Sequence, residues 1–394
     1  GIVFSVMSII QAVGFFFGHG SGNYISRKLG AQETESAEKM ASTGFFFALF
    51  IGAALAVLGL LFLTPLSLAL GSTPTILPYT ERYLGIILLG TPFMTASLVL
   101  NNQIRFQGNA AYAMVGIVSG AVINVVLDPI LIFGIGIFPA MGIRGAAVAT
   151  VAGYSLSMIL AFALLLGKKQ KVRIKLKGFH FQKWLIGRIL TLGLPSFIMN
   201  ALSSFMVTFV NFFLVAYSDT AIAFFGAYFK VQQLIVMTVN GLIQGCLPIM
   251  RFNYGAGNRD RLHSAFRYGT ALVSGMMILG TLTVNFFPAQ LLELFTASEA
   301  MRSFGISAMR IMAASYLFCG LSTMISTYFQ ATEKVGSSIA IQLCRQLLFL
   351  VPALWCLDKL FQLNGIWLAF PVAETATMLI ALVIMAWHRH KNIL

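Results

Sequence analysis

The sequence predicts an all-α integral membrane protein made of two pseudo-symmetric helical lobes. Hydrophobic residues make up 58% of the 394 residues and charged residues only 10%, whereas soluble domains carry about a quarter charged residues. Such a chain cannot cover a water-facing surface, so lipid must surround much of it. Long apolar segments predict the membrane-spanning helices, and a repeated set of short motifs predicts the two lobes.

Each apolar segment has the length of about 20 residues that a helix needs to cross a bilayer. The expected spans are 2–25, 42–70, 82–103, 112–134, 143–166, 185–216, 221–250, 266–288, 304–328, 335–357 and 364–387. No connection between them is long enough to form a soluble domain.

The second half of the chain repeats motifs of the first half. The matching motifs, at an offset of 223 (329 − 106), are Phe106-Gln107 with Phe329-Gln330, Pro129 with Pro352, and Gly142-Ile143 with Gly365-Ile366. Gly30-Ala31 recurs as Gly255-Ala256. Paired halves in a membrane chain are the usual architecture of a transporter.

The repeat also predicts the lobes and a missing helix. Subtracting the offset of 223 from the segment 185–216 gives positions before Gly1. We therefore expect five spans in the first lobe and six in the second, out of six and six, with the two lobes as parallel repeats. The predicted boundaries are 1–166 for the N-lobe, 167–184 for a cytoplasmic linker and 185–394 for the C-lobe.

The distribution of charge predicts the topology. The net charge is +14, but most basic residues lie in short loops between apolar segments, which excludes a nucleic-acid-binding protein. These loops fall on one side of the membrane, so the positive-inside rule predicts a cytoplasmic C-terminus in a multi-pass protein of the cytoplasmic membrane.

The basic stretch 167–178 is a solvated linker between lobes or a site for anionic lipid. Small-molecule substrates and membrane lipids are the expected partners of a monomer.

Only two acidic residues, Asp128 and Glu374, lie well inside apolar segments. Ionisable groups inside a membrane are energetically unfavourable and are therefore functional candidates. Asn124 lies one helical turn before Asp128 on the same face. Their oxygens suit Na⁺, and the carboxylate suits a transferable proton. The alternative is that Asp128 braces the backbone beside Pro129.

Other polar side chains in the second half are candidates for a substrate cavity. Glu374 either faces this cavity or pairs with a basic residue, and Arg345 shares a helix face with Gln342. Asn200 and Ser203 either line a cavity or hydrogen-bond between helices. The candidate set is Asn200, Ser203, Gln244, Gln342, Arg345 and Glu374.

Catalytic motifs are absent from the sequence. It contains no GxSxG, HExxH or Walker A pattern, and its five histidines do not cluster with acids. The chain is therefore predicted to be no enzyme and to need no cofactor, with H⁺ or Na⁺ rather than ATP driving transport.

Several stretches, in this order, resemble the multidrug and toxic compound extrusion (MATE) family. They are Ser26-Arg-Lys-Leu-Gly-Ala31, Arg105-Phe-Gln-Gly-Asn109, Asn124-Val-Val-Leu-Asp-Pro129, Gly145-Ala-Ala-Val-Ala-Thr150, Gly241-Leu-Ile-Gln-Gly-Cys-Leu-Pro248 with Asn253-Tyr-Gly-Ala256, and Arg345-Gln346. The resemblance covers essentially the whole chain, starting at the family's second helix.

The resemblance implies export of varied, often cationic amphiphiles by alternating access, in exchange for H⁺ or Na⁺. It also implies an N-lobe cation site, in which Asn124, Asp128 and Thr150 match the family's fifth- and sixth-helix residues. The family's first-helix Asp has no counterpart in this chain. A second family pattern, with acids in the seventh and tenth helices, is absent from 185–216 and 304–328.

Two other functions remain open from the sequence. One is a lipid-linked saccharide flippase of the same superfamily, with Arg345 and Lys230 binding an anionic substrate. The other is a truncated product that inserts but does not transport.

Overall fold

The computed structural model describes residues 3–167, 170–175, 182–295 and 297–390. These residues divide into two compact units, Gly1–Phe197 with Gly255–Gly257, and Ile198–Tyr254 with Asn258–Leu394. The first unit therefore ends part-way along a helix, Lys183–Leu214. The lobe and linker boundaries drawn from the sequence stay a prediction.

The described residues form helices joined by short connections, and eleven helical spans are long and apolar enough to cross a membrane. This confirms the predicted spans, with shifted ends. The helices up to the end of the first unit are α1 (Phe4–Gly30), α2 (Thr34–Leu61), α3 (Leu63–Ala69), α4 (Leu77–Phe106), α5 (Ala110–Phe133), α6 (Ile143–Leu166) and α7 (Lys183–Leu214). The second unit holds α8 (Asp219–Gly255), α9 (Arg259–Phe286), α10 (Pro288–Glu293), α11 (Glu299–Ala313), α12 (Tyr316–Ala331), α13 (Val335–Leu343), the π-helix η1 (Cys344–Leu350), α14 (Val351–Phe361) and α15 (Leu363–His390).

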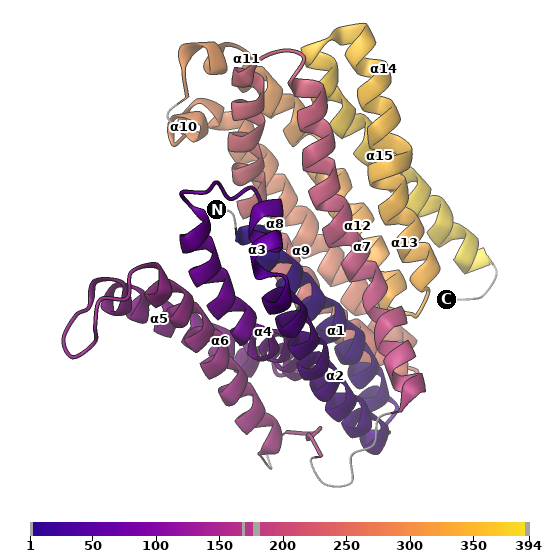
Figure 1. Ribbon diagram of the computed structural model, residues 1–394. Helices are drawn as coiled ribbons and strands as arrows, with labels where there is room; N and C mark the ends of the chain where they lie inside the picture. The colour runs from indigo at the N-terminus through magenta and orange to yellow at the C-terminus, as the bar shows by residue number, and fades with distance from the viewer. Residues whose placement is uncertain (1–2, 168–169, 176–181, 296, 391–394) are drawn as a thin grey trace. The chain divides into compact units, whose positions relative to one another are not determined.

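In the first unit, α4 is the central helix and packs against α1, α2 and α6, while α5 packs mainly on α6 (Figure 1). Small residues allow α5 and α6 to approach closely, as is common between helices in membranes. A Cβ atom on Gly120 would lie 2.6 Å from the Gly153 carbonyl oxygen, and the reverse substitution would meet the Gly120 oxygen at the same distance. This contact brings Asn124 of α5 and Thr150 of α6 to the same level.

In the second unit, α12 packs against α9 and α15, and α15 also packs against η1 and α14. The predicted span 335–357 is one helical run, but its middle, η1, has the wider π-helical turn. π-Helical turns are rare and occur often at functional sites. Here the π-helical turn carries Arg345, one of the predicted site residues.

The backbone repeats an unusual conformation at the start of the last helix of each half. Gly142 before α6 has φ 56° and ψ −130°, and Gln362 before α15 has φ 52° and ψ −135°. Counting from these residues, Gly145 corresponds to Gly365 at an offset of 220 (365 − 145). The sequence match of Gly142 with Gly365 is therefore no structural equivalence, because the connections before the two helices differ in length.

Candidate functional site

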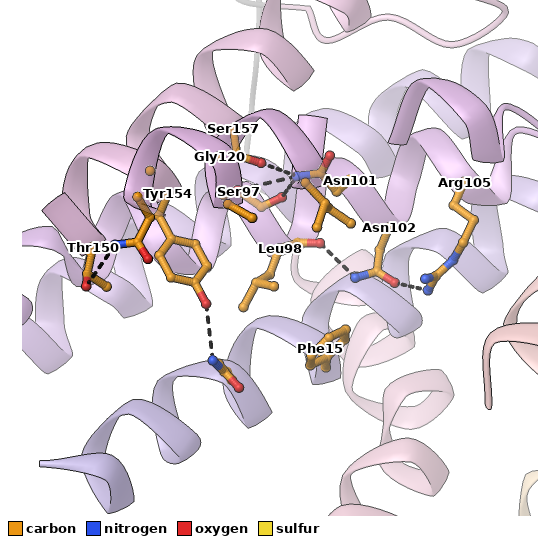
Figure 2. A pocket seen from close by; sticks show the side chains of 15 residues that line it. Phe15, Ser97, Leu98, Asn101, Asn102, Arg105, Gly120, Thr150, Tyr154 and Ser157 are labelled. Carbon is orange, nitrogen blue, oxygen red and sulfur yellow. Dashed lines mark hydrogen bonds between the residues drawn. The ribbon is translucent and has the colours of Figure 1, made fainter. Parts of the chain in front are cut away.

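The first unit contains a partly open cavity of about 370 Å³ between α1, α4, α5 and α6 (Figure 2). Its walls are rich in amide and hydroxyl side chains. The lining residues that carry polar side chains are Gln11, Ser97, Asn101, Asn102, Arg105, Asn124, Thr150, Tyr154 and Ser157. None of the lining residues is a carboxylate, and Arg105 is the charged side chain among them.

Two of the three predicted coupling residues meet at the wall of this cavity. The Asn124 amide nitrogen donates to the Thr150 hydroxyl oxygen at 3.4 Å, joining α5 to α6. Thr150 in turn donates to the Ala146 carbonyl oxygen at 3.0 Å, which fixes its hydroxyl. Because the Asn124 nitrogen faces Thr150, its amide oxygen is left for another partner.

Asp128 lies one turn further along α5 and does not line the cavity. Its side chain is half-buried, and its Oδ1 atom is buried without a hydrogen-bond partner among the described residues. A buried carboxylate oxygen without a donor is unfavourable unless a proton or cation occupies it. Whether Asp128 carries a cation or braces the backbone beside Pro129 stays a prediction.

The structure adds polar contacts that the sequence interpretation missed. Gln11 of α1 donates to the Tyr154 hydroxyl oxygen of α6 at 3.1 Å, and Asn101 of α4 donates to the Ser157 hydroxyl oxygen at 3.0 Å. Ser97, Asn101 and Arg105 follow a four-residue spacing on α4. That spacing puts polar groups on one helix face and is a signal that could have located this wall from the sequence.

Arg105 ends this polar face of α4. Its Nη2 atom lies 3.1 Å from the Nε2 atom of His19 on α1, and it also donates to the Asn102 amide oxygen. Both His19 and Asn102 are buried. The guanidinium therefore contacts one neighbouring helix, α1, and one side chain of its own helix.

Arg345 and Glu374, both predicted for the substrate cavity, form an ion pair in the second unit. The Arg345 Nε atom is 3.3 Å from Glu374 Oε2, and the two side chains are 9% and 15% exposed. Arg345 also donates through Nη2 to the hydroxyl oxygens of Ser322 at 2.6 Å and Thr323 at 2.9 Å. Of the two alternatives for Glu374, the structure shows pairing with a basic residue across helices.

The remaining predicted cavity residues differ in burial and in hydrogen bonding. Gln342 is buried and donates to the Ser326 hydroxyl oxygen at 3.3 Å. Asn200 and Ser203 are exposed, and the Ser203 hydroxyl donates to the Met199 carbonyl oxygen at 2.9 Å. Gln244 is half-buried on α8. Their participation in a substrate cavity stays a prediction.

The sequence matches the MatE family model over residues 1–130 and 195–355. The chain belongs to this family. It is accordingly a multi-pass membrane transporter and not an enzyme.

Similar proteins agree with the family assignment. The chain is 27% identical over 380 residues to the "Multidrug export protein MepA" of Staphylococcus aureus (strain N315), covering 96% of the chain and 83% of that protein. It is also 27% identical over 386 residues to the protein of the same name in Staphylococcus haemolyticus (strain JCSC1435), covering 98% and 84%.

A crystal structure of a MATE protein in a bent conformation superposes with a TM-score of 0.91 at 23% identity, covering 99% of this chain and 86% of the other. This likeness shows that the MatE chain described here has the MATE fold.

Proposed function

We propose that this MatE-family protein exports varied, mainly cationic amphiphiles from the cytoplasm in exchange for H⁺ or Na⁺, by alternating access in the cytoplasmic membrane. The relatives named multidrug export proteins support export of varied compounds. The C-terminus is proposed to be cytoplasmic, from the basic loops alone.

The observation that carries the coupling proposal is the arrangement on α5 and α6. The unpartnered Oδ1 atom of Asp128 lies one turn from Asn124, and Asn124 bonds Thr150. A carboxylate with a neighbouring amide oxygen and hydroxyl provides hard oxygen ligands for Na⁺, and the carboxylate alone can carry a proton. Asp128 is assigned as the cation carrier, with Asn124 and Thr150 orienting or completing its site.

Alternating access is part of the proposal, and linkage describes how it couples the two fluxes. A cation bound at Asp128 changes the relative stability of the two transport conformations, and a substrate does the same with the opposite preference. Each ligand then drives the other across the membrane. This coupling needs no ATP.

The flippase alternative requires a cation available to an anionic substrate. Arg105 lines the first-unit cavity, whereas the Arg345 guanidinium contacts Glu374, Ser322 and Thr323. Lys230 is exposed, with its ammonium 5.9 Å from the ring centre of Phe295. Competition between a dye and a lipid-linked sugar for binding distinguishes the two functions.

The test is efflux of a fluorescent cationic dye from vesicles with an imposed H⁺ or Na⁺ gradient. Asp128→Asn keeps the shape of the side chain but removes its charge, so gradient-driven efflux should be lost. Asp219→Asn is the matched control, because Asp219 is an exposed residue at the first turn of α8. Unimpaired gradient-driven efflux in the Asp128 variant would contradict the coupling role.

A further inference from the structure

The second unit contains a buried pair of opposite charges that the proposed coupling site does not use. Arg345 on η1 and Glu374 on α15 lie 3.3 Å apart, nitrogen to oxygen, and both side chains are largely hidden from solvent. A buried carboxylate requires a proton or a cation nearby. In the described part of the chain, Arg345 is the cation paired with Glu374.

Arg345 is hydrogen-bonded to a third helix, α12. Its Nη2 atom donates to Ser322 and Thr323 hydroxyl oxygens of α12 and to the Cys319 carbonyl oxygen at 3.3 Å. A guanidinium is permanently charged in proteins and presents fixed donors. Arg345 thus keeps its charge and its position against Glu374.

Among the described residues, no second cation is found around Glu374. Besides Arg345, the side chains that interact electrostatically with it are Cys319 of α12 and Tyr228 of α8. Both are ordinarily neutral groups.

The pair occupies the helices that correspond to the coupling helices of the first unit. By the proline match the run 335–361 corresponds to α5 in the repeat, and by the shared backbone start α15 corresponds to α6. Asn124 precedes Pro129 on α5, and Arg345 precedes Pro352 on the matching run. The proposed coupling residues Asn124, Asp128 and Thr150 supply oxygens, whereas the pair in the second unit supplies oxygens together with a cation.

We propose that Arg345 is a tethered counter-cation that keeps exchangeable H⁺ and Na⁺ away from Glu374. This inference rests on the proposed cation-coupled export and makes it more specific, because it confines the exchangeable ion to the first unit. Removing the guanidinium leaves Glu374 buried and unpaired. The carboxylate must then take a proton or a sodium ion from solution, so the protein gains a second exchangeable site.

Infrared difference spectroscopy on the purified protein, with acid or Na⁺ added, tests the proposal directly. Arg345→Met should gain a protonated carboxyl band or a Na⁺-sensitive carboxylate band, and the Arg345→Met/Glu374→Gln double variant should lose it. Arg345→Lys keeps a cation and should resemble wild type. Arg310→Met is the matched control, since Arg310 is exposed and outside the network.

In vesicles, Arg345→Met should raise the number of cations moved per substrate by about one relative to wild type. If Arg345→Met does not fold, the difference between the wild-type spectrum and that of the double variant tests the proposal. It should show an ionised Glu374 carboxylate that does not respond to acid or Na⁺. A Glu374 band in wild type that responds to either cation would overturn the proposal, as would an Arg345→Met protein without a new band. Failure of wild-type export under an ion gradient would instead contradict the proposed function, since the spectra require no transport.

Discussion

The Asn124 amide of α5 and the Thr150 hydroxyl of α6 are joined by a hydrogen bond of 3.4 Å, across 26 residues of chain. The contact depends on the close approach of α5 and α6 at Gly120 and Gly153. It places a polar bridge one turn from the unpartnered oxygen of Asp128. The proposed coupling site is therefore a product of helix packing as well as of sequence.

Removing the Thr150 hydroxyl should weaken cation binding without abolishing export. Thr150→Val leaves the Asn124 amide free to rotate, and the loss of one such bond of about 1.4 kcal/mol corresponds to a roughly tenfold higher cation requirement. The measurement is the cation concentration that gives half-maximal dye efflux. Thr270→Val is the control. Like Thr150, Thr270 is half-buried and donates to a carbonyl oxygen of its own helix, that of Phe266.

Arg251 should be a stability determinant of the second unit. Its fully buried guanidinium donates to the Gln330 and Ala331 carbonyl oxygens at the end of α12 and pairs with Glu333 at 3.0 Å. Arg251→Met leaves those acceptors without this donor, which should reduce stability by about 3–5 kcal/mol. A large drop in the midpoint of thermal unfolding is expected for this variant and little change for Arg259→Met, an exposed position. Equal unfolding midpoints for Arg251→Met and Arg259→Met would show that Arg251 is dispensable for stability.

The corrected repeat predicts that Gly145 and Gly365 are equally intolerant of a side chain. A Cβ atom would lie 2.5 Å from the Leu131 carbonyl oxygen at Gly145 and 1.9 Å from the Leu357 carbonyl oxygen at Gly365. Because both obstacles are backbone atoms, alanine at either position should reduce stability by about 3 kcal/mol or more. Gly226→Ala, with no atom within 4 Å of the added carbon, is the control for thermal unfolding. A tolerated Gly365→Ala would contradict the equivalence.

The turn between α1 and α2 should loosen at acidic pH. The Lys28 ammonium lies 2.5 Å from a Glu33 carboxylate oxygen, and this hydrogen bond lowers the Glu33 pKa below its ordinary value of 4.5. A lowered carboxyl pKa stabilises the fold above the ordinary value, and the stabilisation is lost as the pH falls through the lowered pKa. The protection of the Ala37 amide, which is bonded to the Glu33 carbonyl oxygen, against hydrogen exchange should therefore fall at low pH, measured relative to the intrinsic exchange rate at each pH. Glu33→Gln should remove this pH dependence.

The spans were predicted well from the sequence because membrane helices are recognised by their length and apolar composition. The span 143–166 agrees with α6 at both ends, and the spans around Asn124 and Glu374 agree within a few residues. Two features were not predictable: the break between α11, which ends at Ala313, and α12, and the π-helix η1. Local breaks and π-helical turns leave no signal in hydropathy.

Contacts between helices were harder to predict than the helices themselves. The pairing of Glu374 with Arg345 was one of two alternatives, and the Gln11–Tyr154 bond was missed altogether. Both depend on how each helix is rotated about its axis, which 3.6-residue periodicity does not fix when a helix is apolar on all sides. The family resemblance linked Asn124 with Thr150 where the residue pattern alone could not.

The central claim is that Asp128 couples the movement of a cation to that of the exported compound. The most direct measurement is the reverse flux, in which a substrate gradient alone is imposed on vesicles and Na⁺ or H⁺ movement is recorded. Wild type should move the cation against the direction of substrate flow, and Asp128→Asn should move none. Cation counterflow at the wild-type rate in the Asp128 variant would contradict the claim.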